Sequence, residues 1–379
     1  SVVRAITVNT YEITAKDTSG STVTANASDS GNGGSGVDGS YEINVGLDIY
    51  VKGTGWGAGT WSGGTWGSVS DISASNQLRQ WTQDNFGDDL ISCVRGGGIY
   101  YWDESAGATQ RAVPFGSLSS PSDVPTLALQ IMVSDVDKHI ICFGVNDVGS
   151  STLNPLLVRW SDTESAADWT PTATNQSGGV QLSQGSTIIG ALQTRQEILI
   201  WTDAGITSMR FVGEPFVFSF IEMASGPSLI SPNAAVSANN RVYFMDRGGF
   251  YVYSGSVQRL PCTVLDYVFG QFNLGQQFKC FASHIEEANE VIWFYPSSDS
   301  DEIDRYVTYN YLEEVWAIGS TDDGFTRTAW IEAQSLDYPL AAGKTSGSDT
   351  NYLYNQEKGH SNDGGDFTAY VYLQVNTGC

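Results

Sequence analysis

Basic residues are scarce in this sequence of 379 residues. It holds 18 Lys and Arg, and only six of these are Lys, against 42 Asp and Glu, so the formal net charge is −24. The bases are scattered singly from Arg4 to Lys358. No basic stripe could neutralise a run of phosphates, which argues against tight nucleic-acid binding as the function.

Long apolar runs and closely spaced cysteines are also lacking. No stretch of 18 apolar residues is present, so no segment is expected to span a membrane. The five cysteines are odd in number, lie far apart and mostly sit inside apolar runs; they are Cys93, Cys142, Cys262, Cys280 and Cys379. This pattern favours reduced core thiols over a disulfide framework.

The two ends of the sequence carry expectations of their own. The chain starts at Ser1 without a charged and then apolar leader, so we expect a trimmed start and no visible signal peptide. The last residues, 370 to 379, read as a strand in progress. A C-terminal extension beyond Cys379 is therefore expected.

The composition indicates an all-β fold. Hydrophobic residues make up 41% of the chain, which is ample for a packed core. Gly accounts for 42 residues, and no 12-residue window holds an apolar face with helical periodicity. Short β-branched and aromatic runs bounded by Gly, Asn, Asp and Pro recur instead.

A weak repeat of strand-turn-strand units runs through most of the chain. Six hairpins are predicted at 88 to 103, 138 to 162, 197 to 214, 241 to 255, 290 to 316 and 338 to 359. Their spacing, about 50 residues with room for four short strands, is typical of propeller blades. We predict a β-propeller of about six blades over residues 76 to 359.

The flanking segments differ from the repeat. Residues 1 to 75 form an N-terminal β-rich segment, with strands expected within 1 to 18 and 41 to 53. Between them, residues 19 to 40 are a Ser, Gly, Asn and Asp run that cannot bury enough surface to order itself alone. Residues 360 to 379 are predicted to supply a C-terminal strand that joins the N-terminal segment.

A Trp and Gly tract at 55 to 67 places Trp56, Trp61 and Trp66 five residues apart. On an extended chain this spacing turns Trp61 to the face opposite the other two. Indole faces can stack on sugars or cations. The favoured interpretation is that the three side chains anchor the segment, making them candidate subunit-contact residues.

A carboxylate-rich loop raises the question of a cation site. Asp299, Asp301, Glu302 and Asp304 lie within six residues, but the loop lacks the Gly and the Glu that an EF-hand requires. A solvated hairpin tip is the favoured interpretation. Whether the loop from Asp299 to Asp304 binds a cation stays open.

No catalytic constellation is visible. His139, His284 and His360 are isolated from any plausible nucleophile or second ligand, and the string from Ser161 to Trp169 departs from the Asp-box of sialidase propellers. GKT at 343 to 345 lacks the preceding Gly and the following helix of a phosphate loop. We therefore assign no catalytic, cofactor-binding or metal-binding residue and no cofactor.

Several motifs together resemble the tail nozzle or hub proteins of tailed bacteriophages, often called phage stabilisation or DNA-stabilisation proteins. The resemblance spans about residues 40 to 360, although each motif alone is a hairpin signature. It rests on GWGAGTW and TWG (55 to 67), WTQDNFGDDLISCVRGGGIYYWD (81 to 103), VRWSD with a later W (158 to 169), GG-x-QLSQGSTIIG (178 to 190), ILIWTDAGITSMRFVGEPFVF (198 to 218), RVYFMDRGGFYVYSG (241 to 255), and DRYVTYNYLEEVW with RTAW (304 to 330).

The resemblance implies a structural virion protein of the phage tail, assembled in the host cytoplasm. Such proteins form a ring, usually of six copies, below the portal-adaptor protein. The propeller lies outside, and a platform of N- and C-terminal segments lines the channel. The ring extends the DNA conduit, helps to retain packaged DNA, supports ejection and presents surfaces to fibre, spike or needle proteins. An acidic surface suits this role, because like charge lets genomic DNA pass without sequence-specific binding.

Two alternatives belong to other functional classes. The propeller could be a tail-associated receptor-binding or glycan-binding module that uses its loops. The second alternative, a glycan hydrolase, agrees less well with the sequence, because it would need paired carboxylates at the propeller axis.

Overall fold

The computed structural model describes residues 2–4, 12–16, 22–23, 78–107, 110–135, 137–320, 327–332, 336–344 and 351–358. The chain divides into two compact units, Ser1–Asn44 and Val45–Cys379. In the first unit, β1 (Val2–Arg4), β2 (Glu12–Lys16) and β3 (Thr22–Val23) form an antiparallel sheet in that order.

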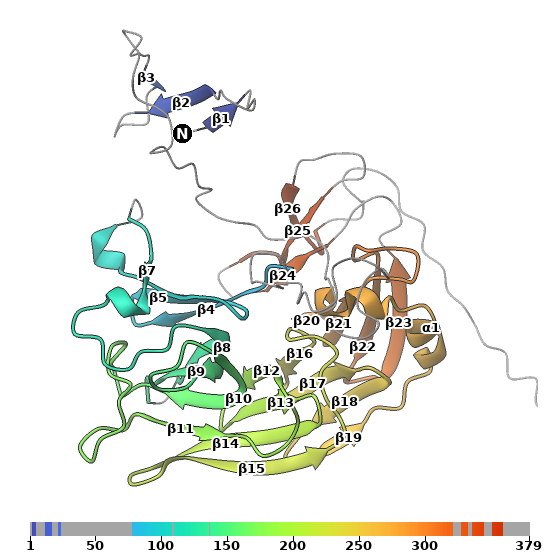
Figure 1. The fold of residues 1–379 in the computed structure, drawn as a ribbon. Helices are drawn as coiled ribbons and strands as arrows, with labels where there is room; N and C mark the ends of the chain where they lie inside the picture. The colour runs from blue at the N-terminus through green and yellow to red at the C-terminus, as the bar shows by residue number, and fades with distance from the viewer. Residues whose placement is uncertain are drawn as a thin grey trace, which may run out of the picture. The chain divides into compact units, whose positions relative to one another are not determined.

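The second unit holds six small antiparallel sheets arranged in a ring, which is a six-bladed β-propeller (Figure 1). Blade 1 comprises β4 (Trp81–Phe86), β5 (Asp89–Val94), β6 (Ile99–Trp102) and β7 (Val113–Pro114). Blade 2 comprises β8 (Ala128–Val133), β9 (Ile140–Asn146), β10 (Leu153–Trp160) and β11 (Gly178–Gln181). Blade 3 comprises β12 (Ile188–Gln193), β13 (Ile198–Thr202), β14 (Gly205–Gly213) and β15 (Val217–Ser225). The predicted all-β propeller of about six blades is thus confirmed.

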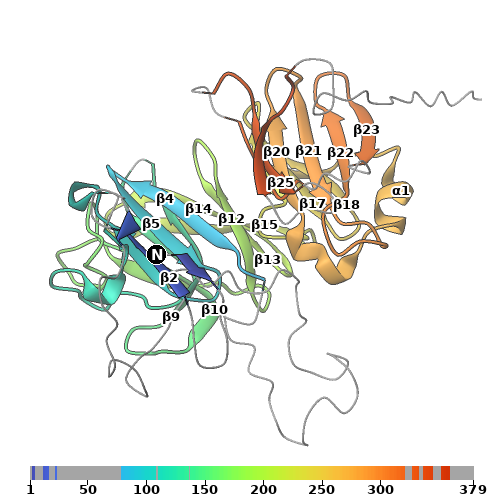
Figure 2. The same cartoon turned by 90° about the horizontal axis from the view of Figure 1, so that it is seen from above.

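The remaining blades follow the same order from the inside outward. Blade 4 comprises β16 (Ala235–Ala238), β17 (Arg241–Asp246), β18 (Gly249–Tyr253) and β19 (Val257–Arg259). Blade 5 comprises β20 (Phe281–Ile285), β21 (Glu290–Tyr295), β22 (Arg305–Asn310) and β23 (Val315–Ser320), seen side by side in Figure 2. Blade 6 comprises β24 (Ala329–Ile331), β25 (Leu340–Lys344) and β26 (Asn351–Asn355). Helical turns are short and include α1 (Leu265–Gly270) between blades 4 and 5.

The six hairpins predicted from the sequence are the second and third strands of the six blades. Each pair is antiparallel in the structure, from β5 with β6 in blade 1 to β25 with β26 in blade 6. In blades 2 and 3 the second strands read as continuous apolar runs because neighbouring blades cover both of their faces. All seven residues of β9 and all five of β13 are buried.

The hydrophobic core lies between consecutive blades and is divided by the period of two along each strand. In β9, Ile141 and Phe143 pack in the cluster shared with blade 3, whereas Ile140, Cys142 and Val145 pack in the cluster shared with blade 1. Further clusters join blades 3 and 4, blades 4 and 5, and blades 5 and 6. Blades 2 to 5 are therefore each packed against a neighbour on both sides.

The innermost strands use side chains to satisfy backbone groups on the strand of the next blade. Gln130 of β8 donates through Nε2 to the Ala191 carbonyl at 2.7 Å and accepts from the Ala191 N–H at 2.8 Å. Asp84 of β4 accepts from the Val133 N–H at 2.8 Å. These bonds close strand edges that would otherwise be open at the axis.

The described cysteines fit the prediction of reduced thiols. Cys93, Cys142 and Cys280 are buried, Cys262 is half-buried, and all four are free. Burial raises the pKa of the Cys142 and Cys280 thiols. Among the described residues, no helix is long and apolar enough to cross a membrane.

Candidate functional site

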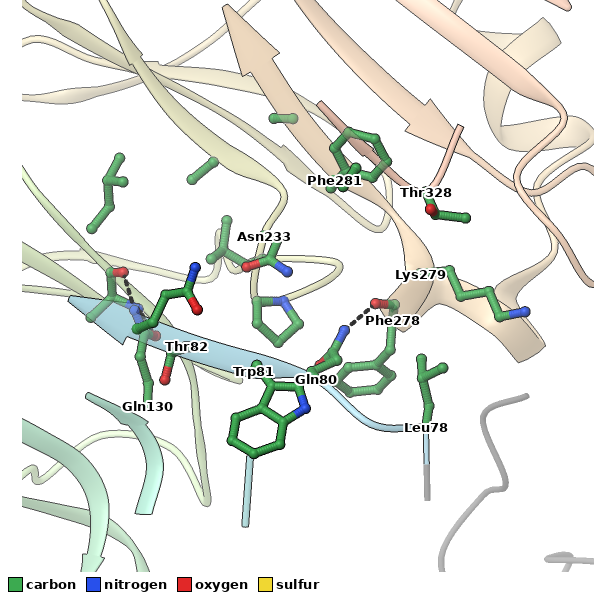
Figure 3. Close-up of a pocket in the computed structure, with 18 of the residues that line it drawn as sticks. Leu78, Gln80, Trp81, Thr82, Gln130, Asn233, Phe278, Lys279, Phe281 and Thr328 are labelled. Atoms are coloured by element: carbon green, nitrogen blue, oxygen red, sulfur yellow. Dashed lines mark hydrogen bonds between the residues drawn. The ribbon is translucent and has the colours of Figure 1, made fainter. Parts of the chain in front are cut away.

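A cavity of about 850 Å³ lies on the propeller axis and is lined by residues from all six blades. Its wall is formed mainly by the innermost strands and the segments that lead into them (Figure 3). Residues that give the wall its chemistry are Trp81, Gln83, Gln130, Trp201, Asn233 and Trp330.

Polar contacts join distant segments of the chain beside this cavity. Gln80, just before β4, donates to the Phe278 carbonyl, which lies close to the start of blade 5 (Figure 3). Ser231 Oγ donates to the same carbonyl at 3.2 Å. Arg95, in the turn between β5 and β6, donates to the carbonyls of Leu129 and Ile188, in blades 2 and 3. These bonds tie several blades together at the axis.

The cavity wall combines indole rings with uncharged polar groups. Trp81 is 44% exposed, and Gln83 and Asn233 are also exposed. The indole N–H groups of Trp201 and Trp330 are buried and have no hydrogen-bond partner among the described residues. An indole face with amide groups suits noncovalent binding of a small, neutral, polar molecule.

The two carboxylates that line the cavity both have structural partners. Asp84 binds the backbone of blade 2, as described above. Glu302 forms an ion pair with Lys279, with Oε1 2.8 Å from Nζ, and Lys279 also donates to the Asp301 carbonyl at 2.7 Å. The side chain of Lys279 is only 8% exposed. Both carboxylates therefore fix parts of the wall in place.

A polar cluster between blades 3 and 4 borders a second pocket of about 690 Å³. Its centre is Glu197, whose side chain is 8% exposed. Glu197 accepts hydrogen bonds from Ser208 Oγ, from Tyr253 Oη at 2.6 Å and from Arg210 Nε at 2.9 Å. These contacts join β14 and β18 through one carboxylate.

The cluster shifts the pKa values of its members. Burial by itself raises the pKa of Glu197, but the hydrogen bonds from Ser208, Tyr253 and Arg210 outweigh it and bring the pKa below its ordinary value. Burial and the bond to Glu197 raise the pKa of Tyr253 to about 12. Glu197 is therefore held as a carboxylate and Tyr253 as a phenol at neutral pH.

Large apolar side chains are exposed on the outer parts of blades 3 and 5. In blade 3, Phe216 is 77% exposed and Val212 is 53% exposed, both at the turn between β14 and β15. In blade 5, Leu312 is 63% exposed and Val315 is 55% exposed. In blade 6, Leu353 is 74% exposed and Tyr352 is 49% exposed. Apolar side chains mark protein contact surfaces where they form a contiguous patch.

The candidate residues from the sequence fall in different places. Trp56, Trp61 and Trp66 lie outside the described residues, as do His360 and the predicted C-terminal strand at 360 to 379. Gly343 and Lys344 belong to strand β25. Gly96 has a φ of +68° in the turn between β5 and β6, where glycine is favoured.

The acidic loop uses its carboxylates for separate local contacts. Asp304 accepts from the Ser297 N–H at 2.7 Å and from Ser297 Oγ at 2.6 Å. Asp301 accepts from Asn273 Nδ2 at 3.3 Å. In the described part of the chain, no group of three or more His, Cys, Asp or Glu side chains is placed to hold a metal ion.

The described histidines and the Ser161 to Trp169 loop have structural contacts. His139 is fully buried, with Nδ1 2.7 Å from the Ser161 carbonyl. His284 Nε2 lies 3.1 Å from the hydroxyl of Tyr311, and burial lowers the pKa of this histidine. Trp169 is buried under the guanidinium of Arg159, whose carbon lies 5.8 Å from the ring centre.

Sequence reasoning did not single out Gln130, Glu197 or Lys279. One signal was available for Lys279, because it is one of only six Lys and precedes the apolar strand β20. Glu197 offered a weaker signal, since it directly precedes the apolar strand β13 and lies two residues after Arg195. Gln130 gave none, because its role depends on which strand of blade 3 lies beside it.

Comparisons with known proteins leave the family open. No protein-family model matches the sequence, and no curated protein matches it significantly. Solved structures that resemble it include Hsv2 of Kluyveromyces lactis, with 11% identity, a TM-score of 0.39, and coverage of 79% of this chain and 85% of that one.

Two bacterial proteins show similarity of the same size. BamB of Moraxella catarrhalis is 13% identical, with a TM-score of 0.39 and coverage of 74% of this chain and 71% of that one. The extracellular domain of a putative one component system from B. thetaiotaomicron is 9% identical, with a TM-score of 0.43 and coverage of 73% of this chain and 33% of that one. Similarities of this size carry no functional assignment.

Proposed function

We propose that this chain is a structural protein of a phage tail, a propeller that assembles with copies of itself into a ring around the path of the DNA. The observation that carries the proposal is the exposed apolar surface on the outer strands of blades 3 and 5. A protein whose function is assembly needs such surfaces, whereas a soluble monomer rarely exposes several large apolar side chains together.

The resemblance to tail nozzle or hub proteins supports the same role. Its motifs include at least one strand of each blade, and they do not include β7, β8, β9, β16, β19, β20, β21, β25 or β26. Under this proposal the partners are further copies of the chain, usually six in all, the portal-adaptor protein, and fibre, spike or needle proteins. The protein is then part of the virion tail.

The size of the axial cavity bears on where DNA would pass. A volume of about 850 Å³ falls within the range of small-molecule sites and is far too small for a duplex. Contacts of Gln80 and Arg95 also join segments of blades that are not neighbours in sequence. The conduit would therefore lie between copies of the chain and not inside one propeller.

Labelling of particles tests the proposed function. An antibody raised against the purified propeller is applied to tailed particles whose genome encodes this chain, and electron microscopy locates the label. We expect label at the tail, close to the junction with the head, and none after the antibody is absorbed with purified protein. Unlabelled tails, in particles that an antibody to the adaptor does label, would overturn the proposal.

A further inference from the structure

The outermost strands of the blades differ in length and chemistry. In three blades the outer strand is short: β7 has two residues and includes Pro114, β19 has three and includes Arg259, and β11 has four. Short strands, Pro and charged side chains are the usual means by which proteins prevent a sheet edge from pairing with another chain. Blades 1, 2 and 4 are therefore protected.

Blades 3 and 5 have long and apolar outer strands. The blade-3 edge is β15, which has nine residues, with Ile221 49% exposed and Glu222 as its one charged residue. The blade-5 edge is β23, which has six residues and no charge, with Val315 55% and Ile318 36% exposed. Neither strand has an outer neighbour in the described part of the chain. Such edges favour pairing with a further strand.

We propose that the blade-3 edge of one copy of this chain pairs with the blade-5 edge of the next copy, so that the two edges form a head-to-tail contact. The proposal rests on the proposed ring and specifies its interface. A head-to-tail contact needs two different surfaces on one chain, and it generates a closed ring when the rotation between copies closes. In the described part of the chain the blade-3 and blade-5 edges are two such surfaces, and the blade-6 edge β26, with Tyr352 49% and Leu353 74% exposed, is a third uncharged edge that this pairing leaves free.

Pairing of like edges would fit the molecule less well. A two-fold dimer would pair one edge, either β15 or β23, with the same edge of a second copy. The other edge would then stay exposed, because blade 4 separates the two edges along the chain. Head-to-tail pairing covers both edges in every copy of a closed ring. The backbone groups of both strands and the exposed Ile221, Val315 and Ile318 side chains would then be removed from water together.

Charge limits which surfaces two copies of this chain can use to bind each other. At a net charge of −24, copies repel one another at long range, so their contact requires short-range apolar and hydrogen-bonding surfaces with few charges. Arg210, on the strand beside β15, is 44% exposed and has Glu197 as its carboxylate partner. In the proposed pairing its remaining donors would bind the exposed Glu313 and Glu314, which directly precede β23.

Two edge variants test the proposal. Ile221→Asp places a charge on the blade-3 edge, and Val315→Asp places one on the blade-5 edge. Val148→Asp is the control, since Val148 is 46% exposed in the loop between β9 and β10, away from both edges. The mass of the full-length protein is measured across a range of concentrations, after circular dichroism has confirmed that each variant is folded.

The wild type and Val148→Asp should assemble, whereas each edge variant alone should self-associate roughly 100-fold more weakly. An equal mixture of the two edge variants should form a dimer and nothing larger, because each supplies one intact edge. If either edge variant alone assembles like the wild type, or if the mixture yields no dimer, the pairing is wrong.

The edge pairing and the tail role can fail independently, and the two experiments distinguish these failures. Tails that are labelled by the antibody but contain variants with both edges changed would refute the edge pairing and leave the tail role intact. A wild-type protein that pairs through the two edges, together with unlabelled tails, would refute the tail role and leave the pairing intact.

Discussion

At the scale of single residues, a few buried polar side chains join strands that lie far apart in the sequence. Arg159 is 3% exposed and donates to three backbone carbonyls, those of Asn146, Asp123 and Trp169. Burial lowers the pKa of its guanidinium. Because a buried charge without partners is costly, the three segments that supply these carbonyls are held in one arrangement by one side chain.

Glu197 gives a pH-dependent prediction. Its pKa is depressed in the folded protein, so its contribution to stability is present above the unfolded value of about 4.3 and is lost as the pH falls through the folded value. Glu197→Gln should lower the free energy of unfolding by about 2 kcal/mol at pH 7. The gap between the two proteins should shrink as the pH falls below about 4.3.

Urea unfolding of both proteins between pH 7 and pH 3 measures this gap. Tyr253→Phe serves as a graded variant, because it removes one of the three hydrogen bonds to Glu197 and keeps the charge. Its effect at pH 7 should be smaller than that of Glu197→Gln. A gap between wild type and Glu197→Gln that stays constant over the whole pH range would contradict the depressed pKa.

At the scale of elements, the second and third strands of the blades were predictable and the innermost strands were not. Strand β13 (ILIWT) is buried on both faces, so its sequence is a continuous apolar run. Strand β4 (WTQDNF) faces the axial cavity on one side, and its residues are alternately exposed and half-buried. A polar strand of this kind resembles a loop in sequence, and its identity becomes clear only from its pairing with β5.

The candidate site was less predictable than the fold for the same reason. The axial cavity is built from innermost strands, and its polar groups act on backbone atoms of neighbouring blades. Such contacts depend on which blades are adjacent and in which register, and neither is encoded by a local pattern. The repeat predicts that blades exist, whereas Gln130 and Asp84 receive their roles from the assembled ring.

Gln130 gives a prediction for the contact between blades 2 and 3. Its amide both donates to and accepts from the backbone of Ala191. Gln130→Glu removes the donor and sets a carboxylate oxygen against the Ala191 carbonyl, so the protein should lose about 1–3 kcal/mol of stability at pH 7. The variant should recover part of this at low pH, where the carboxyl can donate again.

The matched control is Gln83→Glu, the same change on the innermost strand of blade 1. Gln83 is exposed in the axial cavity, so its substitution should change the unfolding free energy by no more than about 0.5 kcal/mol. Denaturant midpoints at pH 7 compare the two variants. Equal losses in both would show that the Gln130 amide does not join the blades.

At the scale of the whole molecule, the shortage of bases agrees with a conduit that DNA passes without adhering. The chain has 42 acids and 18 bases, and the propeller axis is too narrow to carry a duplex. In a ring, the DNA path would lie between copies, and excess acid on that path would repel phosphates. Assembly must then overcome repulsion between the copies, for which long apolar edges in blades 3 and 5 are suited.

Electron cryomicroscopy of intact tailed particles that encode this chain tests the central claim most directly. We expect a ring of six-bladed propellers between the adaptor and the tail tip, with the DNA path between copies lined by acidic side chains. A DNA path lined mainly by basic side chains would contradict the proposal that excess acid keeps the DNA from adhering. A tail without any propeller of this chain around the DNA path would contradict the proposed function itself.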